Sequence, residues 1–534
     1  MERFAELLDR LYYTAGTREK GRLLQEYLRT TPDPDRGWTV AAIGGTLSFD
    51  LFKRNLVKTL TEERVDPYLF ALARDYVGEM SETVAHMWPA PDPQPTEPLP
   101  SLTEVVETFR DARAAEIAEY LAGLLDRMTA TQRWALLKLG TRGLRIGMSA
   151  RSLKRVLADY GEVQVAEVER LWHGVEPPYT ELLQWLDGAG PKPDVSQKIT
   201  FHPVMLSHPI DAETLAALHL PDWHAEWKYD GIRVQLVSSS HGRALFSRTG
   251  EDISEGFPDL LAAIDFEAVL DGELLVGRDG EIGSFNELQQ RLNRRKPSRK
   301  LIETLPSMLM VYDALALDGQ AVVDLTLAER RRALEDWFGA AARERLQLSE
   351  LLTFENTAEL QALRSRADRS AHDHIEGLML KNRHGAYVPG RPKGQWFKWK
   401  RDPLQVDAVM MYAQRGSGKR SSFYSDYTFG VWSGDQLLPI GKAYSGFTDE
   451  ELKRLDHWIR NNTTGRFGPV REVERGLVLE VAFDDLHRSP RHKSGIALRF
   501  PRISRIRWDK PAAEADTLDR VKALLTPGTS VRGT

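Results

Sequence analysis

The chain has 534 residues, of which 42% are hydrophobic and 28% charged, so it can bury several cores. It contains no cysteine, which excludes disulfides, thiolate zinc sites, iron–sulfur clusters and a cysteine nucleophile. The net charge of −5 argues against a uniformly basic nucleic-acid binder, and only residues 403–534 carry more Lys and Arg (21) than Asp and Glu (16). No apolar stretch approaches the roughly 20 residues of a membrane span and no signal-peptide core follows Met1, so we expect a cytoplasmic protein without a membrane partner.

The first part of the chain is predicted to be helical. Phe4, Leu7, Leu8 and Leu11 recur at helical spacing, and apolar residues between 105 and 125 continue the pattern. The proline-rich stretch 88–100 interrupts it, because no helix can run through those prolines, and we interpret it as an internal linker. A segment rich in Gly and Pro at 187–195 then ends the helical part.

Beyond this break the hydrophobic period becomes two, which predicts strands. Helical patterns around 255–264 and 326–338 lie between these strands and indicate a mixed α+β part. From about Asp402 strands dominate, with one helix near 449–461, as in a small β-barrel such as an OB-fold. The last residues, 526–534, are expected to be frayed. The predicted strands are 232–236, 268–276, 305–315, 375–382, 396–400, 406–414, 427–432, 436–444 and 477–483.

The most distinctive local string is EWKYDGIR, from Glu226 to Arg233. A lysine is nucleophilic only when its amine is neutral, so the pKa of Lys228 would have to be lowered by burial or by nearby cations. Gly231 would allow a tight turn. Taken alone, the tetrapeptide KYDG is weak evidence, because an exposed turn at a strand end has the same pattern.

Further motifs follow Lys228 in a fixed order. The strings are SRTG (247–250), LDGELL (270–275), VYDALALDG (311–319), EGLMLKN (376–382), WFKWK (396–400) and RFPRISRIRWDK (499–510). This series resembles the collinear motifs of the covalent nucleotidyltransferases, and in particular those of the ATP-dependent DNA ligases in their three-domain form.

The resemblance implies the fold and the reaction. We expect an all-α DNA-binding domain at 1–190, an α+β nucleotidyltransferase core with ATP-grasp-like antiparallel sheets at 198–401, an OB-fold β-barrel at 402–525 and a tail at 526–534. The implied enzyme is a monomer that uses ATP and Mg²⁺ or Mn²⁺ to seal 5′-phosphate/3′-hydroxyl nicks in duplex DNA. It would serve repair, replication or recombination near the nucleoid.

The resemblance also implies roles for the motif residues. Lys228 would attack the α-phosphate of ATP, with Asp230 beside it in the catalytic motif, and Glu226 would recognise the adenine amino group. Tyr312 would stack on adenine, where the family more often has phenylalanine. Glu273 and Glu376 would bind the divalent metal, and Glu273 also the ribose. The arginines implied to hold the ribose and phosphates are Arg233, Arg248 and Arg391.

Two lysines and the C-terminal motif complete the implied site. Lys398 and Lys400 alternate with aromatic residues, which places both on one face of a strand, where they would neutralise the α-phosphate. In isolation, a solvated edge strand has the same pattern. Arg507 and Lys510 of the RWDK string would orient the pyrophosphate, and the junction 400–403 would be the hinge of a mobile barrel.

The segment 141–158 resembles the part of ligases that contacts the DNA minor groove, which makes Arg142, Arg145, Arg151 and Lys154 candidate DNA-binding residues. Three other features are more simply explained as structural elements than as functional sites. His372-Asp373-His374 is read as a polar turn rather than a metal cluster, GSGK at 416–419 as a surface turn rather than a P-loop, and the run Arg330-Arg331-Arg332 as a solvated helix face.

Four alternatives remain at this point. An mRNA-capping guanylyltransferase shares the KYDG-type motif and a β-barrel but is not expected to have the helical first part. An RNA ligase usually lacks the OB module, and an NAD⁺-dependent ligase uses a four-cysteine zinc module that is impossible here. A non-catalytic DNA-binding protein is the fourth. Labelling with ATP or GTP distinguishes them, since only an active enzyme traps lysine-linked nucleotide.

Overall fold

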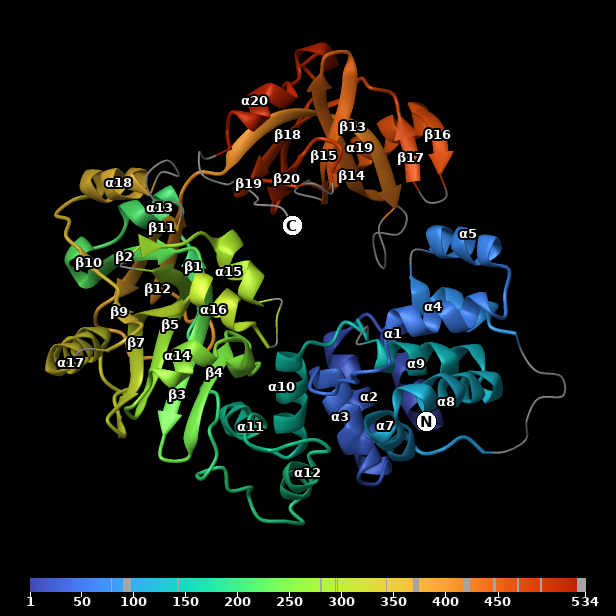
Figure 1. Cartoon of the computed structure of the whole chain (residues 1–534), viewed down its shortest axis with the longest axis horizontal. Coiled ribbons are helices and arrows are strands. Elements are labelled where there is room, and N and C mark those ends of the chain that lie inside the picture. Colours follow the sequence, from blue (N-terminus) through green and yellow to red (C-terminus); the bar gives the residue numbers. More distant parts are fainter. Residues whose placement is uncertain are drawn as a thin grey trace. The chain divides into compact units, whose positions relative to one another are not determined.

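The computed structural model describes most of the chain (Figure 1). The described ranges are 1–77, 79–89, 98–141, 144–278, 281–292, 294, 296–341, 343–367, 374–415, 423–444, 448–467, 470–489 and 492–525. Contacts group the chain into two compact units, one formed by 1–49, 100–111 and 142–401 and the other by 50–99, 112–141 and 402–534. The three consecutive domains stay a prediction, because these units do not follow chain order. The predicted tail, 526–534, lies outside the described residues.

The first 190 residues are helical, as predicted. In the first helix Phe4, Leu7, Leu8 and Leu11 are all buried, which confirms the face that their spacing indicated. The helix before the proline-rich stretch ends at Met87 and the next begins at Leu102. The helices are α1 (Glu2–Tyr13), α2 (Thr17–Thr30), α3 (Asp35–Gly44), α4 (Arg54–Glu62), α5 (Pro67–Val77), α6 (Met80–Met87), α7 (Leu102–Asp111), α8 (Ala114–Arg127), α9 (Ala130–Gly140), α10 (Ala150–Tyr160), α11 (Val165–Trp172) and α12 (Thr180–Leu186). None of the described helices in the chain is long and apolar enough to cross a membrane.

The α+β part contains two largely antiparallel sheets. The first has the order β1 (His208–Pro209), β12 (Trp396–Lys400), β11 (Ile375–Asn382), β2 (Trp223–Tyr229) and β10 (Leu351–Leu352), and only β1 and β12 run parallel. Both of its edge strands are two residues long. The second sheet has the order β4 (Gly242–Ser247), β3 (Ile232–Ser239), β5 (Ala268–Arg278), β7 (Ser307–Leu317) and β8 (Gln320–Ala321), with β6 (Glu281–Ile282) on β5 and β9 (Leu346–Leu348) on β7.

Helices pack against these sheets around two cores. The helices α14 (Pro258–Ala262), α15 (Phe285–Leu292) and α17 (Leu327–Ala340) contribute to a core that includes Val234, Leu270 and Leu309. The helices α13 (Ala212–Ala216) and α18 (Thr357–Arg366) contribute to a second core with Ala225 and Leu378, and α16 (Arg299–Thr304) has no buried residue. The helix predicted around 255–264 is broken into a 3₁₀ turn, Ser254–Gly256, and the short α14, because Pro258 lacks the N–H that a continuous helix needs.

The C-terminal part is an OB-like half-barrel whose longer helix, α19, lies at the predicted place, and a short second helix, α20, follows the last strand. Its main core includes Val406, Phe429 and Leu479. The elements are β13 (Leu404–Arg415), β14 (Tyr424–Ser433), β15 (Gln436–Tyr444), α19 (Asp449–Asn461), β16 (Thr463–Phe467), β17 (Val470–Val473), β18 (Val478–Phe483), β19 (Asp485–Arg488), β20 (Ile496–Arg499), β21 (Arg502–Arg507) and α20 (Leu518–Lys522).

Candidate active site

Three lysines share one face of the first sheet. Lys228 on β2 lies opposite Gly377 on β11, and Gly377 lies opposite Lys400 on β12. Met379, two residues further along β11, is paired with Lys398. Directly paired residues point to the same side of a sheet, so the strand register places the three ammonium groups on one face and confirms the prediction for Lys398 and Lys400.

Glu376 lies between two of these lysines. One of its carboxylate oxygens contacts Nζ of Lys228 and the other is 2.7 Å from Nζ of Lys400. Burial would raise the pKa of Glu376, but the two lysines outweigh it and lower the pKa. Burial, followed by the nearby Lys228 and Lys400, lowers the pKa of Lys398. The site therefore keeps Glu376 ionised and makes the charged form of Lys398 less favourable.

The position of Glu376 depends on the glycine that follows it. The pairing between β11 and β2 shifts between Ile375 and Gly377, which is a β-bulge. Gly377 has a φ of 144°, and a Cβ atom there would lie 2.7 Å from Cα of Lys400 and against the carbonyl oxygen of Trp399. Only glycine fits this position without a shift of β12. The bulge at Gly377 therefore packs directly against the backbone of the strand that carries Lys400.

A second carboxylate, Glu273 on β5, approaches the same group of residues. Burial, partly offset by Lys228 and reinforced by Glu376, raises the pKa of Glu273 to about 8. Among the described residues no hydrogen bond or ion pair is made by its carboxylate. Two neighbouring carboxylates, one of them without a counter-ion, are a donor set that suits a hard divalent cation, although no described group of three or more candidate ligands is found.

The turn after Lys228 is shaped by packing. Asp230 is buried, and its N–H donates to the carbonyl of His374 at 2.7 Å. A Cβ at Gly231 would lie 2.5 Å from the carbonyl oxygen of Leu274 and 2.8 Å from Cγ of Glu273. Gly231 is thus required because β5 approaches the backbone closely, and its φ is not positive. The turn was predicted correctly, but the reason for its glycine was not.

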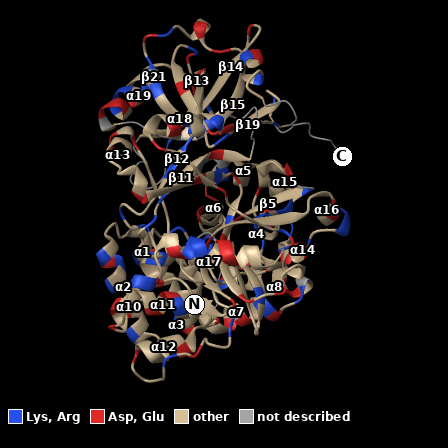
Figure 2. Ribbon diagram, turned by 90° about the vertical axis from the view of Figure 1, so that its left-hand side faces the viewer, with Lys and Arg blue, Asp and Glu red and all other residues tan. Residues whose placement is uncertain are grey.

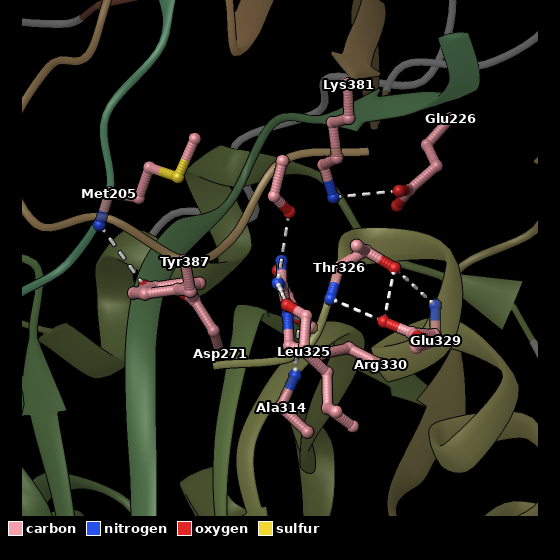
Figure 3. Close-up of polar contacts among 12 residues, drawn as sticks. Met205, Glu226, Asp271, Ala314, Leu325, Thr326, Glu329, Arg330, Lys381 and Tyr387 are labelled. Carbon is pink, nitrogen blue, oxygen red and sulfur yellow. Dashed lines mark hydrogen bonds and ion pairs between the residues drawn. The ribbon is translucent and has the colours of Figure 1, made fainter. Parts of the chain in front are cut away.

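Glu226 has a partner that sequence reasoning missed. Its carboxylate is 2.8 Å from Nζ of Lys381, and both side chains are almost fully buried (Figure 3). The ammonium of Lys381 also lies 4.4 Å from the ring centre of Tyr312 and 4.7 Å from that of Trp396. The available signal was the alternation of Lys381 with Gly377 and Met379 along a predicted strand, which places it on the face of the active-site lysines.

Arg233 is engaged by the protein itself. Its guanidinium donates two hydrogen bonds to Asp271, at 3.0 and 2.6 Å, and one to the carbonyl of Met205 at 2.6 Å. Tyr387 donates to Asp271 at 2.7 Å and accepts from the N–H of Met205 at 3.3 Å (Figure 3). Arg233 is thus part of a buried network that supports β3 and β5, and its implied contact with the ribose and phosphates stays a prediction.

The basic run on α17, expected to lie on a solvated face, is partly buried. Arg330 is 1% exposed and makes a bidentate pair with Asp313, at 2.8 and 2.9 Å, while Arg331 is also buried and only Arg332 is exposed. Arg330 also donates to the carbonyl of Leu325 at 2.7 Å (Figure 3). The interpretation as a solvated face was wrong, because the apolar pattern alone cannot reveal a buried counter-ion on another element.

The other predicted site residues are more scattered. Arg248 is exposed after β4, and Arg391 is exposed but close enough to Lys398 to lower its pKa further. Arg507 and Lys510 lie in the second compact unit, where both contact Asp407. The candidates His372-Asp373 and GSGK lie outside the described residues.

Of the candidate DNA-binding residues, Arg145 and Arg151 are exposed and Arg142 lies outside the described residues. Lys154 is half-buried, with its ammonium 5.4 Å from the ring centre of Trp172, and burial lowers its pKa. Figure 2 shows basic and acidic residues interspersed along the helices rather than segregated into blocks of one sign.

Comparisons with known proteins identify the family of this chain. The model for the ATP dependent DNA ligase domain matches residues 204–400, and that for the ATP dependent DNA ligase C terminal region matches 420–510. The chain is 38% identical over 457 residues to a probable DNA ligase of Koribacter versatilis, covering 80% of this chain and 79% of that protein. It is 31% identical to DNA ligase 1 of Korarchaeum cryptofilum, covering 75% of this chain and 73% of that protein.

The fold also matches a solved structure, Pmar-Lig_PreS3, with a TM-score of 0.59 at 16% identity, covering 94% of this chain and 99% of that chain. This likeness bears on the fold alone. The family models, the two relatives and the ordered motifs around Lys228 agree with one another. The chain belongs to the ATP-dependent DNA ligases, which seal nicks through an adenylated intermediate.

Proposed function

We propose that Lys228 is the residue that carries AMP in this ligase. The observation that supports this is the convergence of Lys228, Lys398 and Lys400 with Glu376 on one sheet face. Nζ of Lys228 would attack the α-phosphorus of ATP, forming a nitrogen–phosphorus bond while the bond to the pyrophosphate oxygen breaks. The amine must lose a proton before it attacks, and the other two ammonium groups would stabilise the negative charge that develops on the phosphate.

We propose that the adenine lies beside the pair formed by Glu226 and Lys381. The carboxylate would accept a hydrogen bond from the exocyclic amine, and the ring of Tyr312 provides a flat surface for the base. Arg233 acts through Asp271 as a positioning residue for this part of the pocket. Arg391 and Arg248, both exposed, remain candidates for contact with the phosphates or the ribose.

A divalent cation, Mg²⁺ or Mn²⁺, fits Glu273 and Glu376. Glu273 has a raised pKa because burial outweighs the effect of the nearby Lys228 and Arg233, and a bound cation would favour its ionised form. The chemistry that the cation supplies when bound is neutralisation of phosphate charge. The protein's own residues position the reacting groups, since Glu376 binds both Lys228 and Lys400.

The experiment for this proposal is labelling with α-labelled ATP. The wild-type protein should trap acid-stable, lysine-linked AMP, and Lys228→Ala should trap none while keeping most of its affinity for nicked duplex. A Lys228→Ala variant that still forms the adduct would contradict the assignment. Labelling by GTP in place of ATP would favour a capping-type enzyme.

The proposed DNA substrate is a nicked duplex, with Arg145 and Arg151 contacting phosphates. Because such contacts release counterions, affinity for the nick should fall steeply as the salt concentration rises. A binding constant that stays flat between low and moderate salt would argue against contacts along the backbone. Arg151→Gln should reduce the slope of this salt dependence.

A further inference from the structure

Two motif residues of the C-terminal unit converge on one carboxylate oxygen. Nζ of Lys510 is 2.7 Å from Oδ2 of Asp407, and Nη1 of Arg507 is 3.4 Å from the same atom. Asp407 lies on β13, and Arg507 is the last residue of β21. These three side chains are at most about a quarter exposed, and Arg507 also pairs at 2.9 Å with Asp509, whose side chain is 59% exposed.

The backbone of Asp407 is held in place by two hydrogen bonds to Asp516. The N–H of Asp407 donates to a carboxylate oxygen of Asp516 at 2.9 Å, and the N–H of Asp516 donates back to the carbonyl of Asp407 at 2.8 Å. Its other carboxylate oxygen, Oδ1, is buried without a hydrogen-bond partner among the described residues. A buried oxygen without a hydrogen bond is unfavourable, so the carboxylate of Asp407 is only partly satisfied in this arrangement.

The geometry of the cluster resembles the way in which two cations bind a phosphate oxygen. An ammonium and a guanidinium that converge on one anionic oxygen would accept a phosphate oxygen in its place. We propose that Asp407 is a positioning residue that competes with the phosphates of ATP and with pyrophosphate for Arg507 and Lys510. This inference rests on the proposed adenylation of Lys228 and on the role that the family resemblance implies for Arg507 and Lys510, which is to orient the pyrophosphate.

The competition has a consequence for the reaction. Adenylation of Lys228 releases pyrophosphate, and pyrophosphate that stays bound can attack the lysine-linked AMP and regenerate ATP. A carboxylate that reclaims Arg507 and Lys510 weakens the binding of pyrophosphate and so disfavours this reversal. The same competition also lowers the affinity of the enzyme for ATP. Asp407 would thus trade affinity for the substrate against release of the product.

The test is Asp407→Asn, which keeps the shape of the side chain and removes its charge. We expect the KM for ATP in self-adenylation to fall about three- to fivefold. The concentration of pyrophosphate needed to remove AMP from the adenylated enzyme should fall by the same factor. This is the size expected for the loss of two partly exposed ion pairs. Sealing of a pre-adenylylated nick should be unchanged, since that step uses no pyrophosphate. An unchanged or increased KM for ATP would overturn the proposal.

Three comparisons make the result specific. Asp407→Ser also removes the carboxylate, but it places no amide group next to the two cations. It should show the same fall in the KM for ATP, and it serves as the test if the Asn variant folds poorly. Asp426→Asn breaks a different ion pair of the same half-barrel, with Lys442 at 3.6 Å, and should leave both constants unchanged. Adding Lys510→Gln to Asp407→Asn should abolish most of the gain, and a gain that persists would contradict the proposal.

Failure of the proposed function gives a different result. If the wild-type protein forms no lysine-linked AMP, the assignment of Lys228 is wrong. If the wild-type protein is labelled normally and neither variant at Asp407 changes the KM for ATP or the response to pyrophosphate, only the competition by Asp407 is refuted.

Discussion

Glu226 and Lys381 form an ion pair 2.8 Å long across the neighbouring strands β2 and β11, with both side chains almost completely removed from solvent. A buried charge whose partner is removed stays uncompensated, whereas the loss of both charges is much better tolerated. The pair that we propose to lie beside the adenine is therefore also important for the stability of the fold.

Lys381→Met should lower the free energy of unfolding by about 3–5 kcal/mol, because the carboxylate of Glu226 loses its counter-ion. Urea unfolding measures this loss. The double variant Glu226→Met, Lys381→Met should recover much of the stability without recovering adenylation. A double variant as unstable as Lys381→Met alone would show that packing, and not charge, dominates at this position.

Glu273 should make stability depend on pH. Its pKa is raised by burial from 4.5 to about 8, so the folded state binds the proton more tightly than the unfolded chain does. The resulting stabilisation is complete below pH 4.5 and is lost as the pH rises through about 8. One pKa unit corresponds to about 1.4 kcal/mol. With an allowance for screening, the free energy of unfolding of Glu273→Gln relative to that of the wild type should therefore rise by roughly 2–4 kcal/mol from pH 5 to pH 9.

The measurement for Glu273 is urea unfolding at several pH values in buffer that contains a chelator. Repeating it with Mg²⁺ should reduce the difference, since a cation bound by Glu273 favours the ionised form. A difference that does not change with pH would contradict the raised pKa.

Gly377→Ala should impair adenylation and stability together. The new Cβ would meet the backbone of Trp399 and Lys400, which moves the strand that carries Lys398 and Lys400. We expect a loss of about 1–3 kcal/mol from the strained backbone and a large fall in the rate of adduct formation. Gly434→Ala is a matched control, because Gly434 also has a positive φ, 57°, but no atom lies within 4 Å of its Cβ position. Equal effects of the two changes on adenylation would refute this account.

Arg330→Met and Arg332→Met should differ sharply although they lie on the same helix. Arg330 pairs with Asp313 in a buried site, so its loss should cost about 3–5 kcal/mol in a denaturation experiment. Arg332 is exposed, and its replacement should change stability by about 0.5 kcal/mol or less. Similar small effects for both variants would indicate that the pair adds little to stability.

Much of the fold could be predicted from hydrophobic periodicity. The predicted strands 375–382 and 396–400 coincide with β11 and β12, because both are short apolar stretches bounded by polar residues. The alternation also placed Lys398 and Lys400 on one face correctly. The helix near 449–461 coincides with α19 for the same reason, since its apolar residues recur at helical spacing.

What the sequence could not reveal were contacts between elements that are distant along the chain. The pairing of Glu226 with Lys381 depends on β2 and β11 being neighbours, and the burial of Arg330 depends on Asp313 of β7. The orientation of Glu376 depends on a bulge that no periodicity indicates. The network of Arg233 with Asp271 and Tyr387 joins three separate segments, so the motif order, which implied a contact of Arg233 with the ribose and phosphates, could not reveal these protein partners.

The two edges of the sheet that carries Lys228 are both only two residues long, and one of them ends in Pro209. A strand this short offers almost no row of unpaired backbone groups, and proline removes a donor from what remains. The catalytic sheet is thereby a poor template for the edge-to-edge association that leads to aggregation. Extending β1 or β10 by a few β-branched residues should accordingly make the protein precipitate at concentrations at which the natural chain stays dispersed.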